Sequence, residues 1–109
     1  MSKEIIHHTA EMKWEKLQEF PGPADVKIVR EDPSLGAKTM LVRIPADGQI
    51  APHSHQGIVQ HFVLEGQYEA DGQLYETGSY RMMPVRCNVS PISTKGGVTI
   101  LMIYDPVSK

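Results

Sequence analysis

Short runs of alternating apolar and polar residues, separated by turn residues, make up most of the chain from Asp25 onward. Alternation with a period of two is typical of strands that bury one face, and such strands at close spacing predict a closed or double-sheet β fold. Asp71-Gly72 predicts a two-residue hairpin, because a type I′ turn needs positive φ at both central residues. The expected strands are Val26–Val29, Lys38–Ile44, Ile58–Leu64, Gln67–Ala70, Leu74–Tyr75, Ser79–Met83, Asn88–Ile92 and Val98–Tyr104.

The first 24 residues do not share this alternation. Ala10–Leu17 has weak helical spacing, and Pro21-Gly22-Pro23 stops any regular element. Trp14 is interpreted as part of a strap that covers one end of the core. We therefore expect an N-terminal arm over 1–24 and a β-barrel over 25–109.

Composition narrows the class of protein. A chain of 109 residues suits a single domain, and its net charge of −2 without a basic block argues against nucleic acid or an anionic membrane as a partner. No apolar run approaches the ~20 residues that span a bilayer, and no secretory signal is evident. Cys87 is the single cysteine, so no intrachain disulfide can form. These features together predict a cytoplasmic protein.

His53 and His55 are the strongest candidates for chemistry. Residues two apart on a strand point to the same face, so both imidazoles would face one way and could chelate a divalent transition metal. The alternative is a pair of exposed histidines in a polar loop. The setting favours the metal, because the pair follows Asp47-Gly48 and precedes a strongly β segment that ends in Leu64-Glu65-Gly66.

These residues resemble the first cupin motif, in which a glycine, a spacer and His-x-His are followed after three or four residues by a glutamate, and then by a strand that ends in glycine. Gly78 to Pro84 is similar to the first half of the second cupin motif. The resemblance covers about residues 25 to 105. It implies an all-β cupin double-stranded β-helix, a jelly-roll barrel, with an N-terminal arm.

The chain departs from both motifs at ligand positions. Gln60 occupies the glutamate position, Arg86 replaces the second glycine of the second motif, and Val89 replaces its final histidine. A glutamine carbonyl oxygen can coordinate a metal but brings no negative charge. The resemblance therefore implies a metal on His53, His55 and Gln60. The alternative for Gln60 is a buried amide hydrogen-bonded inside the barrel.

His61 is the rival third ligand. Gln60 and His61 lie on opposite faces of one strand. Motif spacing predicts that Gln60 points inward and His61 outward, whereas a bulge near Gly57 would exchange the two faces. Cys87 is either a soft ligand or, as is more usual for a lone cysteine, a small buried apolar residue.

Barrel-lining residues would shape a ligand pocket. Arg43 and Arg81 are strand arginines that could pair with a carboxylate substrate. The strand pattern alone does not say which large side chains face inward. The candidates are Tyr68, Tyr80, Met82, Met83 and Tyr104.

Two classes of function are compatible with the resemblance. The first is a metal-dependent enzyme, dioxygenase-like or isomerase-like, that acts on a small oxygenated organic molecule, as in the cupins that cleave diketones or hydroxyketones. The second is a non-catalytic binding or sensing module with a degenerate or absent metal site, as in the cupin domains of some anti-sigma factors. Either class predicts a small-molecule ligand and a homodimer. The ion would be Fe, Ni, Zn or Mn, and the sequence leaves open whether the chain is an enzyme.

Overall fold

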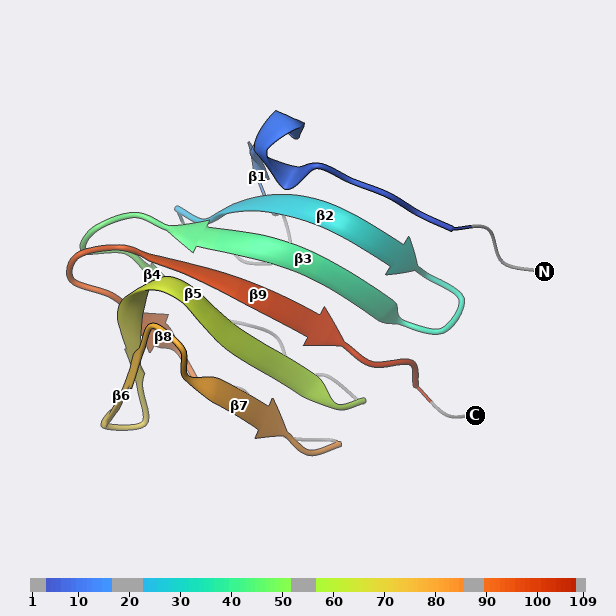
Figure 1. The fold of residues 1–109 in the computed structure, drawn as a ribbon. Coiled ribbons are helices and arrows are strands. Elements are labelled where there is room, and N and C mark those ends of the chain that lie inside the picture. Colours follow the sequence, from blue (N-terminus) through green and yellow to red (C-terminus); the bar gives the residue numbers. More distant parts are fainter. Residues whose placement is uncertain (1–3, 17–22, 52–56, 86–89, 108–109) are drawn as a thin grey trace.

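The part of the chain that the structure describes is almost entirely β-strand (Figure 1). It comprises residues 4–16, 23–51, 57–85 and 90–107 of a computed structural model. One short 3₁₀ turn, η1 (Thr9–Glu11), is the helical element among these residues. None of their helical segments has the length and apolar character that crossing a membrane requires. The predicted all-β class is confirmed.

Nine strands form within the described residues. They are β1 (Glu15–Lys16), β2 (Asp25–Asp32), β3 (Ala37–Ile44), β4 (Gln49–Ile50), β5 (Val59–Ala70), β6 (Gln73–Glu76), β7 (Tyr80–Met83), β8 (Ile92–Ser93) and β9 (Val98–Tyr104). All pairings between them are antiparallel. The order across the sheet is β1-β2-β3-β9-β5-β8-β4, and β6 and β7 also pair with β5. The sheet curls on itself, so that one face becomes concave (Figure 1).

Strand β5 is the central element because it belongs to both halves of the curl. Its first half pairs with β7 and β9, and its second half pairs with β6 and β8. The register shifts between Val63 and Glu65, and Gly66 follows with φ +79°. A bulge bends a strand without ending it. The two strands predicted over Ile58–Leu64 and Gln67–Ala70 are therefore one bent strand.

The hairpin between β5 and β6 forms as predicted. Asp71 and Gly72 both have positive φ, 53° and 74°. The register then pairs Ala70 with Gln73 and, two steps further, Tyr68 with Tyr75. This turn places two tyrosines side by side on adjacent strands.

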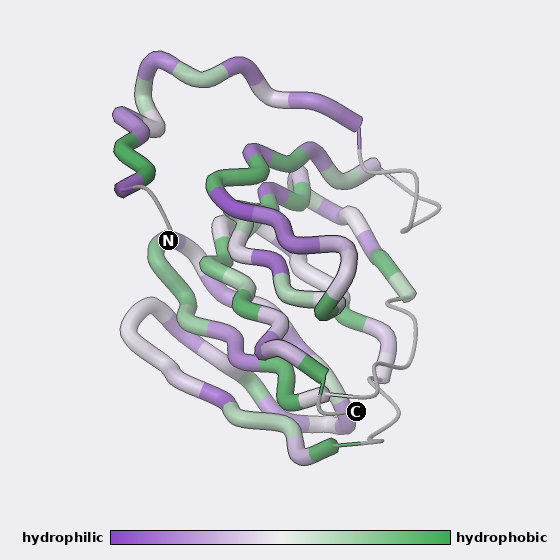
Figure 2. The backbone as a smooth tube through the Cα atoms, turned by 90° about the vertical axis from the view of Figure 1, so that its right-hand side faces the viewer, coloured by the Kyte–Doolittle hydropathy of each residue, from purple (hydrophilic) through white to green (hydrophobic). Residues whose placement is uncertain are grey.

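The concave face is apolar over most of its area. Alternate residues of β3 and β9 are fully buried, as the period of two predicts. The alternation of apolar and polar positions is visible along the tube in Figure 2. The core consists of Ala24, Val26, Met40, Val42, Ile44, Ile50, Val63, Tyr68, Ala70, Ile92, Val98, Ile100 and Met102.

The arm lies against the outer face of β2 and β3. Strand β1 pairs with β2, and Lys27 Nζ donates a hydrogen bond to the Thr9 carbonyl oxygen at 2.7 Å. Two cations lie over the Trp14 ring, with Lys27 Nζ 4.6 Å and Arg43 Cζ 4.2 Å from its centroid. Trp14 was expected to cover an end of the core. It lies on the outer face instead, where its ring makes cation–π contacts with Lys27 and Arg43.

Candidate functional site

The inner face of β5 carries His61, contrary to the prediction. Val59, His61 and Val63 are buried, whereas Phe62 and Leu64 are exposed on the other face. The residue expected to point outward therefore points inward, and Gln60 shares the outer face with Phe62 and Leu64. The prediction that Gln60 faces inward is wrong.

The strand phase explains this error. The motif allows three or four residues between His55 and the ligand position, and the prediction counted four. Counting three instead gives Val59, which is 3% exposed and begins β5 on the inner face. Burial of Val59 is favourable. Because residues two apart on a strand share a face, His61 then points inward as well.

Gln60 is held by two hydrogen bonds on the outer face. Its Nε2 donates to Asp105 Oδ1 at 2.9 Å, and the Tyr80 hydroxyl donates to its Oε1 at 2.7 Å. The oxygen that would coordinate a metal thus already accepts a hydrogen bond. The amide connects β5, β7 and the chain after β9.

The other predicted metal-site residues lie outside the described residues. These are His53 and His55, together with Arg86, Cys87 and Val89 at the second motif. Within the described ranges, no group of three or more His, Cys, Asp or Glu side chains could hold a metal ion. The described residues do not by themselves supply a metal site.

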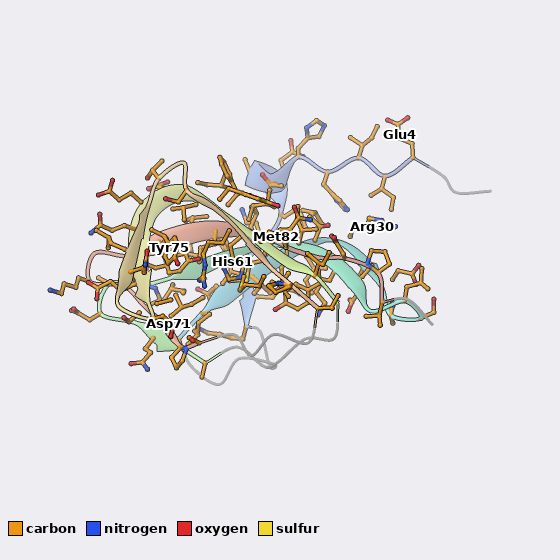
Figure 3. The ribbon with its side chains drawn as sticks, turned by 90° about the horizontal axis from the view of Figure 1, so that it is seen from below. Glu4, Arg30, His61, Asp71, Tyr75 and Met82 are labelled. Atoms are coloured by element: carbon orange, nitrogen blue, oxygen red, sulfur yellow. The ribbon has the colours of Figure 1, made fainter. Side chains whose placement is uncertain are left out.

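A polar cluster interrupts the apolar interior. His61 Nδ1 and the Tyr68 hydroxyl are 3.0 Å apart, and Arg81 Nη1 donates to the same hydroxyl at 3.1 Å. The Tyr68 hydroxyl therefore links the guanidinium and the imidazole through two hydrogen bonds. Both rings are almost completely buried, at 1% and 0% exposure. Figure 3 shows His61 and Tyr75 within the curl of the sheet.

Register brings Arg81 to this cluster. Arg81 pairs with His61 across β5 and β7, and the partly buried guanidinium also lies over the Tyr75 ring, with 4.4 Å between Cζ and the centroid. Tyr68 and Tyr75 are stacked, with centroids 5.1 Å apart. The guanidinium, the two phenol rings and the imidazole form one connected group, which we call the inner cluster (His61, Tyr68, Tyr75, Arg81).

Burial sets the charge of the inner cluster. Burial, together with the smaller effect of the nearby Arg81 guanidinium, lowers the pKa of His61 from 6.5 to about 3. Burial also raises the pKa of Tyr68, although the hydrogen bond from Arg81 opposes that shift. At neutral pH the imidazole and phenol are therefore uncharged, and Arg81 carries the positive charge of the cluster.

Tyr75 was not singled out from the sequence. A signal for it was present, because a two-residue turn at Asp71-Gly72 pairs Ala70 with Gln73 and so pairs Tyr68 with Tyr75. Of the other predicted lining residues, Met83 is buried, whereas Tyr80 and Met82 are more than half exposed on the outer face.

A separate hollow of about 220 Å³ opens where β4, β5 and β8 meet. Tyr68 is its one member shared with the inner cluster. Its other walls are mainly turn and strand-end residues of both charges, including Asp47, Glu69 and Lys95. That mixture does not favour one ligand chemistry.

Curled antiparallel strands around a buried interior, with the motif glycines Gly66 and Gly78 at strand and turn positions, define a cupin. Residues 2–108 match the family model of the ChrR cupin-like domain, so the chain belongs to that family. The predicted resemblance to cupins is confirmed. No curated protein sequence matches the chain significantly.

Solved structures share this fold. A proposed acetylacetone dioxygenase from Methylibium petroleiphilum PM1 has a TM-score of 0.84 at 16% identity, over 99% of this chain and 88% of that chain. An acetylacetone dioxygenase from Acinetobacter johnsonii has a TM-score of 0.75 at 14% identity, over 95% and 74%. The structure of Rhodobacter sphaeroides SigE in complex with the anti-sigma ChrR gives 0.72 at 19% identity, over 90% and 52%. At these identities the likeness shows the fold alone.

Proposed function

We propose that this protein is a metal-binding cupin that takes a small oxygenated organic molecule into the interior of its barrel. The observation that carries the proposal is the inner cluster, a hydrogen-bonded group of polar side chains within a face that is otherwise apolar. Pockets for small molecules combine apolar walls with a few polar groups that fix orientation. Structures with this fold named as acetylacetone dioxygenases support a ligand of that size.

The proposed metal ligands are His53 and His55, as the sequence predicts. A divalent Fe, Ni, Zn or Mn ion bound there would act as a Lewis acid toward a carbonyl oxygen. Gln60 does not fit the ligand set well, because both ends of its amide are bonded on the outer face. In this chain Arg81 would donate hydrogen bonds to the ligand, and Tyr68 would orient the guanidinium by accepting one of its N–H groups.

Replacing His53 and His55 together by alanine is expected to abolish metal binding. The measurement is elemental analysis of the purified, untagged protein, which should contain about one equivalent of transition metal per chain before the change and none after it. The matched control is His7→Ala/His8→Ala, because these two histidines are exposed in the arm. Gln60→Ala should also keep its metal, because its side chain is engaged on the outer face.

Equal metal content in His53→Ala/His55→Ala and in the control would remove this pair from the proposed site. Absence of metal from the unaltered protein, even after incubation with Fe(II), Ni(II), Zn(II) and Mn(II), would favour the non-catalytic binding module. Ligand turnover separates the classes further, because an enzyme changes the mass of its ligand and a sensing module does not.

We also propose that the protein forms a homodimer through the outer face of β5 and β7. The face consists of Phe62, Leu64, Tyr80 and Met82, here called the outer patch, which are 39–57% exposed. Phe62 pairs directly with Tyr80, so the patch is continuous across the two strands. None of the four is charged, so two copies related by a two-fold axis would meet without repulsion.

Placing a charge in the outer patch is expected to dissociate this dimer. Phe62→Glu or Met82→Glu would bring two carboxylates together across the two-fold axis, and the mass measured by analytical ultracentrifugation should fall to that of one chain. Leu74→Glu is the control, since Leu74 is an equally exposed apolar residue on β6, outside the patch. A monomeric unaltered protein, or a Phe62→Glu variant that remains dimeric, would refute this interface.

A cytoplasmic location is part of the same proposal. It is based on the sequence, since a chain with Cys87 as its single cysteine forms no intrachain disulfide and is suited to a reducing compartment.

A further inference from the structure

The two arginines that the sequence left as alternatives for a carboxylate ligand have different surroundings. Arg43 lies on the outer face, where Nη2 is 3.3 Å from Asp25 Oδ2 and the guanidinium stacks on Trp14. Arg43 thus already has a carboxylate partner, which it shares with Lys16. Among the described residues, no carboxylate lies within ion-pair distance of Arg81.

An arginine on the inner face without a counter-ion is energetically costly. A partly buried charge loses hydration, and proteins ordinarily compensate by pairing it. The compensation seen for Arg81 is weaker, namely one hydrogen bond to Tyr68 and stacking on Tyr75. A ligand anion would complete the site.

The neighbouring groups also favour an anion. The buried imidazole of His61 is neutral, and the Tyr68 hydroxyl is protonated. Arg81 therefore carries the charge of the inner cluster, and its side chain is partly exposed whereas His61 and Tyr68 are buried. A partly exposed guanidinium beside uncharged groups is complementary to carboxylate or enolate oxygens.

Stacking on Tyr75 holds the guanidinium plane in place. Of its five N–H donors, one is directed at Tyr68, and the others have no hydrogen-bond acceptor among the residues that the structure describes. A planar guanidinium can bind a carboxylate through two parallel hydrogen bonds, which a lysine cannot do. The site thus selects both the charge and the shape of the ligand group.

We propose that Arg81, held by Tyr68 and Tyr75, binds the carboxylate of a small oxo- or hydroxy-acid inside the barrel. This inference rests on the proposed function, in that it takes the barrel interior as the ligand site. It goes further by assigning the ligand class and the residue that recognises it. Neutral diketones of the same size would lack this contact.

Calorimetric titration with pyruvate, using pyruvamide as its neutral analogue and acetylacetone as a neutral diketone, tests the assignment. The unaltered protein is expected to bind pyruvate more tightly than either neutral compound. Arg81→Gln should weaken pyruvate binding by about 10- to 100-fold, the range for a lost hydrogen-bonded charge contact, and should leave the two neutral compounds unaffected. Arg81→Lys should restore only part of the affinity. The matched control is Arg43→Gln, which should bind as the unaltered protein does.

Repeating the titrations after metal removal with a chelator distinguishes the two proposals. Pyruvate binding that survives in Arg81→Gln but disappears with the metal would overturn the assignment to Arg81 and would support the metal site. Binding of acetylacetone without pyruvate would overturn the carboxylate class and leave the barrel as the ligand site. Absence of binding by all three compounds would count against both proposals. Circular dichroism shows whether Arg81→Gln retains its fold. If this variant is unfolded, Arg81→Lys takes its place in the comparison.

Discussion

Replacing Gly66 by alanine is expected to lower the free energy of unfolding by roughly 2–5 kcal/mol, the largest effect of any single methyl group that we can identify. Gly66 has φ +79°, a left-handed conformation that costs an L-residue about 1–2 kcal/mol. A Cβ at this position would also overlap the carbonyl oxygen of Gly97 on the neighbouring chain segment. Since that atom belongs to the backbone, it cannot rotate away, and overpacking adds about 1–3 kcal/mol.

Gly72 provides a matched control for the conformational part of this cost. Its φ is +74°, almost the same as that of Gly66, but nothing lies within 4 Å of the position that a Cβ would occupy. Gly72→Ala should therefore cost only about 1–2 kcal/mol. Urea unfolding of both variants measures the difference. Equal losses of stability in Gly66→Ala and Gly72→Ala would show that β5 and Gly97 can move apart, and that their close packing does not require a glycine at position 66.

Lowering the pH from 7 to 5 is expected to cost the metal-free protein about 2 kcal/mol of stability through His61 alone. The pKa of this imidazole is 6.5 in the unfolded chain and about 3 in the folded protein. Below pH 6.5 the unfolded chain binds a proton that the folded chain excludes, so acid favours unfolding. The contribution is complete above pH 6.5 and is lost as the pH falls toward 3.

His61→Gln separates this contribution from those of other titrating groups. A glutamine can still accept the Tyr68 hydrogen bond but does not titrate between pH 5 and 7. The loss of stability over that range should then be smaller by about 2 kcal/mol than in the unaltered protein. His7→Gln, an exposed histidine of the arm, should leave the pH dependence unchanged. Parallel pH profiles for the unaltered protein and His61→Gln would show that the folded protein admits a proton on His61.

Some of these features were recognisable from the sequence, and others were not. Gly66 was recognisable as the glycine that ends the first motif, and Asp71-Gly72 as a hairpin turn, because both depend on local backbone conformation. The face on which His61 lies was not recognisable. A change of one residue in the loop between His55 and β5 exchanges the two faces, and the sequence allowed either count.

The sequence by itself determined the β class, most strand positions, the hairpin and the resemblance to cupins, since these depend on alternation and turn chemistry over a few residues. Tertiary structure decided that β5 is one strand bent at a bulge. It also placed Gln60 in a network with Tyr80 and Asp105 and, among the described residues, brought a carboxylate within ion-pair distance of Arg43 but not of Arg81. These outcomes depend on strand phase and on partners 18 to 45 residues away in the chain. Local pattern does not encode such contacts, because they form only when the sheet curls and burial selects one face over the other.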